Sequence, residues 1–254
     1  MDRSLSSFHE LLLDKGVAFV RYKLPDQESV TLVSFSPKHF DSLEFLKDED
    51  LEGFVFAPFK ADALHPIWFL SGDEIIKEGC NIEALINRVS EMPSSTIKST
   101  SRSSSTTKLD YSKAFEKFRS EIIKEKLDKA ILSKLAVEDR GEASLIHLFS
   151  ELSSTYSKAF TYFIHLPNGE SWMGASPELL LQQDKISMRT MALAGTQLVE
   201  NRKIEDISWE NKEREEQAYV KKYIHDIYFF LNLNFLNQTK NDTNVDVISL
   251  KKSI

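Results

Sequence analysis

Two polar turns in the second half of the chain carry residues suited to acid–base chemistry and ligand binding. Glu178 follows Ser176-Pro177, a step that favours a turn and the start of a helix. Gly195 and Thr196 end the next apolar run and offer a backbone amide and a hydroxyl. Because both turns lie at the ends of neighbouring apolar segments, this stretch is more typical of a functional site than of a core, and Glu178 is a candidate catalytic carboxylate. The alternative is a structural carboxylate that stabilises a helix N-terminus through the helix dipole.

Lys129 is a candidate base. It begins the run 129–137, which is predicted to form a strand. Strand alternation places Lys129 on the same side as Ile131 and Ser133. A lysine held there loses part of its hydration, which lowers its pKa and makes it a candidate general base. The alternative is an exposed lysine at a strand edge.

Glu216 is a candidate metal ligand because it lies at the head of an apolar helical stripe. The stripe continues through Val220, Ile224, Ile227 and Leu231. A carboxylate that faces inward needs a partner, and a divalent cation is one such partner. Its neighbours Glu213 and Glu215 are expected to point elsewhere. The alternative is a solvated charge run over residues 212–216, stabilised by i,i+4 ion pairs.

The elements that must position these residues are predicted to form an α+β fold. In the second half we expect helices at 177–181 and about 209–231, and strands at 160–166, 171–174 and 185–194. Closely spaced strands from 160 to 194 can pair as antiparallel neighbours, which favours a layered α+β sheet over a doubly wound parallel one. Earlier in the chain, strands are predicted at 17–22, 30–35 and 53–59, and helical stripes around 8–12, 82–89, 111–122 and 145–152.

Residues 94–107 are mostly serine and threonine. Such a stretch cannot bury enough apolar area to offset the entropy lost on ordering. We interpret it as a linker or surface loop between an N-terminal α/β region, residues 1–93, and a second region, residues 108–254.

The bulk composition is that of a soluble globular protein. The chain has 254 residues, 41% hydrophobic and 28% charged, with a net charge of −7. The absence of a basic patch argues against a nucleic-acid partner, and no apolar run has the length of a membrane span. The single cysteine, Cys80, excludes an intrachain disulfide, and the N-terminus has no signal-peptide core, so a reducing cytoplasm is expected. The six scattered histidines argue against zinc, and no glycine-rich nucleotide motif is present.

Four ordered segments of the chain resemble the chorismate-binding enzyme family, which includes isochorismate, salicylate, anthranilate and aminodeoxychorismate synthases. The segments are residues 127–134, 174–179, 192–196 and 212–217, and residues 53–59 also resemble an N-terminal segment of isochorismate synthases. The resemblance implies the layered sheet-and-helix fold of the anthranilate synthase component I type. It also implies that chorismate is the substrate.

Two positions distinguish the reactions within this family. Lys129 stands where isochorismate and salicylate synthases carry the lysine that activates water. Ala194 stands where aminodeoxychorismate synthases carry a nucleophilic lysine, so covalent amine transfer is disfavoured. The resemblance therefore points to an isochorismate synthase serving menaquinone or catechol-siderophore biosynthesis. Salicylate synthase, which adds pyruvate elimination to the same first step, is the alternative.

The resemblance also implies a mechanism. Lys129 takes a proton from the water that attacks C2 of chorismate, and Glu178 protonates the departing C4 hydroxyl. Mg²⁺, held partly by Glu216, binds the ring carboxylate, while Ala194, Gly195 and Thr196 contact the substrate. The lysine must be neutral and the glutamate protonated, and burial would move both pKa values in those directions.

The resemblance predicts a catalytic domain that is incomplete at its C-terminus. Ile254 follows soon after the predicted long helix, and the family's second metal-binding glutamate, its substrate-binding arginine and lysine, and its glycine-rich wall have no counterpart. We therefore expect little or no turnover, which formation of isochorismate by this chain alone would refute. The alternative is a non-catalytic relative that binds a partner chain through an open sheet edge, as a monomer or with weak self-association.

Overall fold

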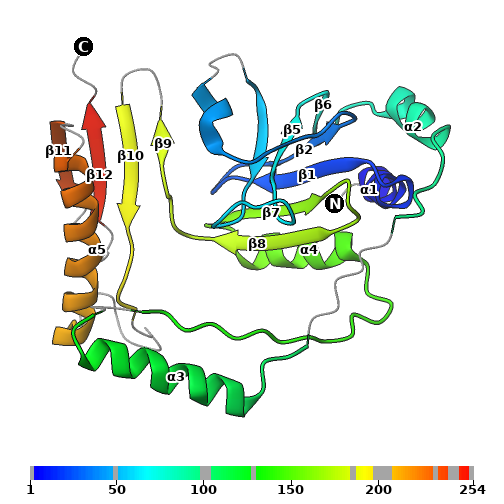
Figure 1. Ribbon diagram of the computed structural model, residues 1–254. Helices are drawn as coiled ribbons and strands as arrows, with labels where there is room; N and C mark the ends of the chain where they lie inside the picture. Colours follow the sequence, from blue (N-terminus) through cyan, green and yellow to red (C-terminus); the bar gives the residue numbers. More distant parts are fainter. Residues whose placement is uncertain are drawn as a thin grey trace. The chain divides into compact units, whose positions relative to one another are not determined.

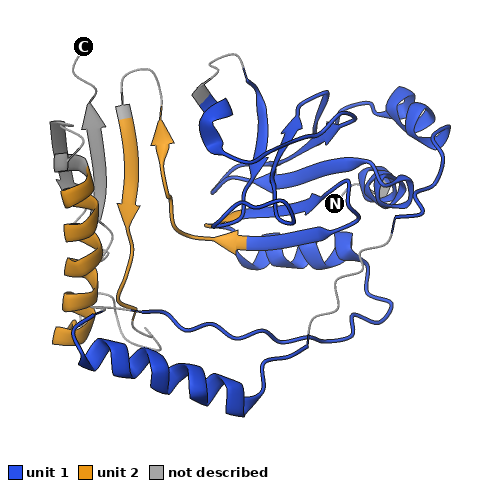
Figure 2. Ribbon diagram, in the orientation of Figure 1, with its two compact units in different colours: residues 1–157, 161–174 blue, residues 158–160, 175–254 orange. Residues whose placement is uncertain are grey.

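The computed structural model describes residues 3–47, 51–97, 104–126, 130–183, 187–196, 208–230, 234–239 and 246–251. The chain forms two compact units (Figure 2). The first contains residues 1–157 and 161–174, and the second contains residues 158–160 and 175–254.

The chain begins with a helix and six strands, followed by three helices and then two strands that belong mainly to the first unit (Figure 1). The elements are α1 (Arg3–Lys15), β1 (Ala18–Lys23), β2 (Ser29–Ser34), β3 (Lys38–Phe40), a 3-10 helix (Leu43–Lys47), β4 (Gly53–Phe56), β5 (Ile67–Ser71), β6 (Glu74–Lys77), α2 (Glu83–Ser90), α3 (Lys108–Ile123), α4 (Leu145–Thr155), β7 (Phe160–His165) and β8 (Ser171–Ser176).

The main sheet of this unit has the strand order β6-β2-β1-β7-β8. Its central strand β1 is antiparallel to both neighbours, so that Val20 lies opposite Leu32 of β2 and Ile164 of β7. Strands from both sides of the Ser/Thr-rich stretch therefore share one sheet. The assignment of residues 94–107 as a linker between two domains stays a prediction.

Strand alternation divides the core between the two faces of this sheet. Phe19, Val33 and Phe163 pack with residues of α1, α2 and α4 on one face. Val20 and Ile164 pack on the other face, in the cluster that includes Leu70 of β5. β5 is the middle strand of a three-stranded sheet, β3-β5-β4. Burying each such side chain contributes roughly 1.5–3 kcal/mol, so the paired faces account for the layered arrangement.

The strand expected over 129–137 is wrong for the described residues of that run. Residues 130–137 have no strand structure, and Ile131 is 83% exposed. The backbone amide of Leu135 donates to Thr106 Oγ1 and its carbonyl accepts from the Thr106 amide, at 2.9 and 2.8 Å. Isolated contacts of this kind, which Val137 also makes with Ser105, cannot replace the continuous backbone ladder that a strand requires. The β-branched and apolar residues of this run were therefore not sufficient to predict a strand.

The second unit contains an antiparallel sheet with the strand order β11-β12-β10-β9. Its strands are β9 (Gln182–Gln183), β10 (Ser187–Ala192), β11 (Asn234–Thr239) and β12 (Asp246–Lys251). The predicted long helix is confirmed as α5 (Asn211–Phe230). Because every pairing recorded among the described strands is antiparallel, the α+β prediction is confirmed. Within the described residues, no helix combines the length and apolar character needed to cross a membrane.

Candidate functional site

Five of the six predicted site residues lie in the second unit. Residues 194–196 follow β10, Glu216 is on α5, and Glu178 precedes β9. Lys129 lies outside the described residues, so its role as a base stays a prediction from the resemblance.

Glu178 belongs to the second unit, but it does not begin a helix. Residues 177–181 have no helical structure, which corrects our expectation from the Ser-Pro step. The carbonyls of Leu179 and Leu180 accept hydrogen bonds from the Met191 amide and Thr190 Oγ1, at 3.3 and 2.7 Å. Because these groups bond to β10, they are not used in a helical turn. The Glu178 side chain is exposed, so the burial that our mechanism expected for the acid is absent in the described structure.

Gln217 connects α5 to the segment that follows β10. Its side chain is only 7% exposed. Its Nε2 donates to the carbonyl of Ala192 at 2.9 Å, and its Oε1 accepts from the amide of Ala194 at 3.0 Å. One side-chain amide thus binds the backbone on both sides of Leu193. Residues 192–194 are thereby held against the first turns of α5.

Gly195 lies directly against the same helix. Its φ is +20°, and a Cβ at this position would come within 2.7 Å of the Glu213 carbonyl oxygen and 3.0 Å of Glu213 Cβ. Only glycine allows the backbone to approach the helix this closely without a clash. Thr196 follows with its side chain exposed. The segment therefore presents a glycine and a hydroxyl beside the N-terminal part of α5.

Glu213 and Glu216 lie one helical turn apart at the start of α5. Glu213 Oε2 is buried and has no hydrogen-bond partner among the described residues. Glu216 is half-buried, whereas Glu215 between them is exposed. An orphaned carboxylate oxygen in a protein interior is costly, and a cation is one way to compensate it.

The resemblance implies Mg²⁺, and this pair of carboxylates fits such an ion. In the described part of the chain, no group of three or more His, Cys, Asp or Glu side chains is placed to hold a metal. Mg²⁺, however, commonly binds through only one or two carboxylates together with water and substrate oxygens. Glu213 and Glu216 supply two carboxylates from one helix, one of them with an unsatisfied oxygen. Both residues could therefore hold the ion.

Two residues of this arrangement were missed by reasoning from the sequence. Glu213 was expected to point elsewhere, and Gln217 was noticed only as part of a matching segment. The available signal was spacing: residues 213, 216 and 217 follow helical steps of three and four, so they share a face with the apolar stripe of α5. What the spacing could not show was that the backbone of residues 192–195 lies against that face.

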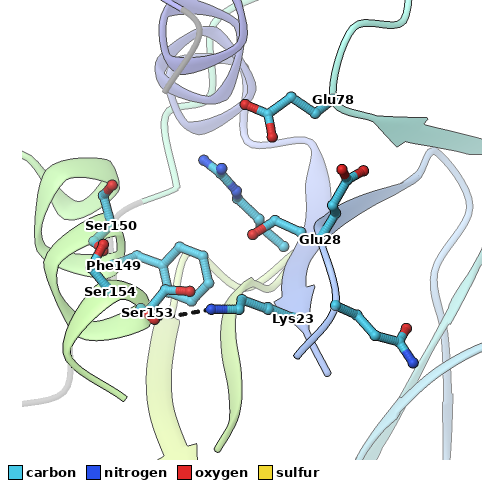
Figure 3. A pocket seen from close by; sticks show the side chains of 10 residues that line it. Lys23, Glu28, Glu78, Phe149, Ser150, Ser153 and Ser154 are labelled. Carbon is cyan, nitrogen blue, oxygen red and sulfur yellow. Dashed lines mark hydrogen bonds between the residues drawn. The ribbon is translucent and has the colours of Figure 1, made fainter. Parts of the chain in front are cut away.

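The first unit contains a separate cavity of about 250 Å³, lined partly by α4 and β1 (Figure 3). Lys23 Nζ donates to the Ser153 carbonyl at 3.3 Å, and the Arg21 guanidinium lies 5.7 Å from the centre of the Phe149 ring. Burial lowers the pKa of Arg21. The cavity also contains Glu28 and Glu78, so its wall carries charges of both signs, and it includes none of the residues of the four matching segments. We therefore place the candidate site in the second unit.

Comparison with known proteins identifies the family. The model of the chorismate-binding enzyme family matches residues 71–235, more than half of the chain. The protein belongs to the chorismate-binding enzymes. The matched range spans the Ser/Thr-rich stretch and includes Glu178, residues 194–196 and Glu216.

Solved structures of similar fold include two described as isochorismate synthases. One is a 2,3-dihydroxybenzoate-specific isochorismate synthase, DhbC from Bacillus anthracis, with a TM-score of 0.58 and 17% identity, covering 96% of this chain and 70% of that one. The other is MenF, the menaquinone-specific isochorismate synthase from Escherichia coli, with a TM-score of 0.48 and 13% identity, covering 99% and 67%. The first supports the chorismate-binding fold. No curated protein sequence matches the chain at a significant level.

Proposed function

We propose that this chorismate-binding enzyme is of the isochorismate synthase type, with chorismate as substrate and Mg²⁺ as cofactor. The observation that carries the proposal is the attachment of residues 192–195 to the turn of α5 that bears Glu213 and Glu216. A substrate-binding backbone and two carboxylates suited to a metal are thereby brought together. We further propose a cytoplasmic enzyme whose product enters menaquinone or catechol-siderophore biosynthesis.

The roles proposed for the residues are those that the family resemblance implies, with Glu213 added. Glu216 and Glu213 hold the ion, which when bound neutralises the substrate's ring carboxylate and fixes its orientation. The Gly195 amide and the Thr196 hydroxyl donate hydrogen bonds to the substrate. Lys129 removes a proton from the water that adds to C2, and Glu178 donates a proton to the C4 hydroxyl as it leaves. Because Glu178 is exposed in the described structure, we expect bound substrate to shield it from water.

Ala194 favours water addition over nitrogen transfer. A covalent amine route needs a nucleophilic amine at this position, and the alanine methyl group cannot form a bond to the ring. Its amide is also already engaged by Gln217 Oε1. The position therefore contributes an apolar contact to the substrate wall and leaves water as the attacking group.

Chorismate binding, measured by calorimetry with and without Mg²⁺, tests the proposal independently of turnover. We expect binding that requires Mg²⁺ and that is weakened about tenfold or more by Glu216→Gln, because one charge-assisted ligand is lost. Glu215→Gln, an exposed neighbour on the same helix, is the matched control and should bind normally. Absence of Mg²⁺-dependent chorismate binding by the wild-type chain would contradict the proposal.

Product analysis separates the proposed reaction from its alternative. After incubation with chorismate and Mg²⁺, chromatography should show that any product formed is isochorismate, without release of pyruvate, and that its amount is small. Equal amounts of salicylate and pyruvate would instead assign the chain to the salicylate synthases, since they eliminate pyruvate after the same first step.

A further inference from the structure

Gln217 lies where the chain leaves the regular hydrogen-bonded pattern of β10. The pairing of β10 with β12 ends at Ala192, and its pairing with β9 covers only Met188 and Arg189. Beyond Ala192 no described strand pairs with the backbone. The Gln217 side chain takes over that role, donating to the Ala192 carbonyl and accepting from the Ala194 amide.

We infer that Gln217 is a positioning residue, which sets the substrate-binding segment 194–196 in register with the metal-binding turn of α5. This inference rests on the proposed function, since it assigns the purpose of the contact to that same site. Gln217 directly follows Glu216 in the helix, so displacement of either one displaces the other. The Ala194 amide donates a hydrogen bond to the side-chain oxygen Oε1 of Gln217. Position 194 is the one that distinguishes water addition from nitrogen transfer.

The chemistry of the contact requires an uncharged side chain that donates and accepts at once. A glutamine amide does both, with its NH₂ and its carbonyl in one plane. A carboxylate of the same shape can still accept from the Ala194 amide, but it cannot donate to the Ala192 carbonyl and would repel it. A protonated carboxylic acid can again do both. The role of Gln217 can therefore be switched by pH in a glutamate variant.

Gln217→Glu is the decisive variant. A glutamate has an ordinary pKa of about 4.3, and burial at this position against a carbonyl oxygen should raise it. At about pH 5 the variant should bind chorismate and Mg²⁺ with an affinity within about twofold of that of wild type. At about pH 8 its affinity should be about tenfold lower, because the buried hydrogen bond to the Ala192 carbonyl is replaced by a repulsion. Glu213 and Glu216 are present on α5 in both proteins, so the comparison with wild type at each pH isolates the effect of the group at position 217.

Two further variants separate positioning from general destabilisation. Gln217→Ala should weaken binding at both pH values, because it can neither donate nor accept. Gln183→Glu, an exposed glutamine on β9, should behave as wild type at both. Wild-type affinity of Gln217→Glu at about pH 8 would overturn the inference. So would a loss of affinity at about pH 5 that equals the loss at about pH 8.

Amide hydrogen exchange at Ala194 gives a readout that does not depend on chorismate. At about pH 8 this amide should exchange faster in Gln217→Glu than in wild type, and at about pH 5 the two should be equal, because only the protonated acid restores both bonds. Unchanged exchange at about pH 8 would overturn the inference. If the variant and wild type differ in exchange as expected but wild type does not bind chorismate, the proposed function fails and the substrate role of Gln217 fails with it, while the contact itself is established.

Discussion

Acid should destabilise the first unit, chiefly through the buried histidine His9. His9 of α1 is fully buried, its Nε2 lies 2.8 Å from Thr31 Oγ1, and its ring lies 5.5 Å from that of Phe19. Burial, reinforced by the positive charge of Arg21, lowers the pKa of His9 to about 3. In the unfolded chain the pKa of histidine is about 6.5.

The sign of the effect follows from these two pKa values. Below about pH 6.5 His9 is protonated in the unfolded state but stays neutral in the folded state. The free energy of unfolding therefore falls as the pH decreases, until His9 of the folded state is protonated at about pH 3. At 1.36 kcal/mol per pKa unit, the loss between pH 7 and pH 5 is about 2 kcal/mol, and the full loss is about 4–5 kcal/mol. A change of about 2 kcal/mol corresponds to a fall in Tm of roughly 4–8 °C for a protein of this size. Burial lowers the pKa of His165 too, which adds to the loss in the same direction.

Urea unfolding of wild type and His9→Gln at pH 7, 6 and 5 measures this contribution. Glutamine can keep a hydrogen bond to Thr31 but does not titrate, so the variant should lose about 2 kcal/mol less than wild type between pH 7 and pH 5. His147→Gln, which replaces an exposed histidine on α4, is the control and should follow the wild-type curve. Parallel pH profiles for wild type and His9→Gln would refute the reasoning.

Two further predictions concern the second unit and its site. Gly195→Ala should destabilise the unit by about 2–4 kcal/mol, measured by urea unfolding, because it adds a Cβ 2.7 Å from the Glu213 carbonyl to the cost of a positive φ. Gly79→Ala, at φ +81° with open space around it, should cost only about 1 kcal/mol, and equal costs would contradict the close approach at Gly195. Glu213→Gln should raise stability without Mg²⁺ by about 1 kcal/mol, since it replaces a carboxylate whose buried oxygen has no partner with an uncharged amide, and should reduce the gain in Tm on adding Mg²⁺. Glu215→Gln should change neither quantity, and an undiminished Mg²⁺ response of Glu213→Gln would exclude Glu213 from the metal site.

Long periodic elements were predictable because their signal is repeated many times. The stripe from Val220 to Leu231 predicts a helix over about 209–231, and α5 spans Asn211–Phe230. Strand β7 follows a run of β-branched and aromatic residues and lies within one residue of its predicted limits. Several independent side chains give the same indication in each case, so tertiary contacts had little to override.

Short segments were not predictable because one neighbour decides their conformation. Residues 177–181 contain an ordinary helix-start signal, but hydrogen bonds to Thr190 and Met191 draw their carbonyls away from a helical turn. Residues 130–137 have strand-forming side chains, but among the described residues their backbone hydrogen bonds are with Ser105 and Thr106. Neither partner is close in sequence, and local propensity is too weak to outweigh such contacts.

The amino-acid sequence alone determined the residue types of the candidate site and the class of fold. The order of the four motif segments, the alanine at position 194 and the spacing of the apolar residues in α5 are properties of the chain itself. The tertiary structure decided which groups meet. It places the buried amide of Gln217 between Ala192 and Ala194, and it brings Gly195 against Glu213. Such contacts depend on the path of the backbone in space, and a sequence pattern does not contain that path.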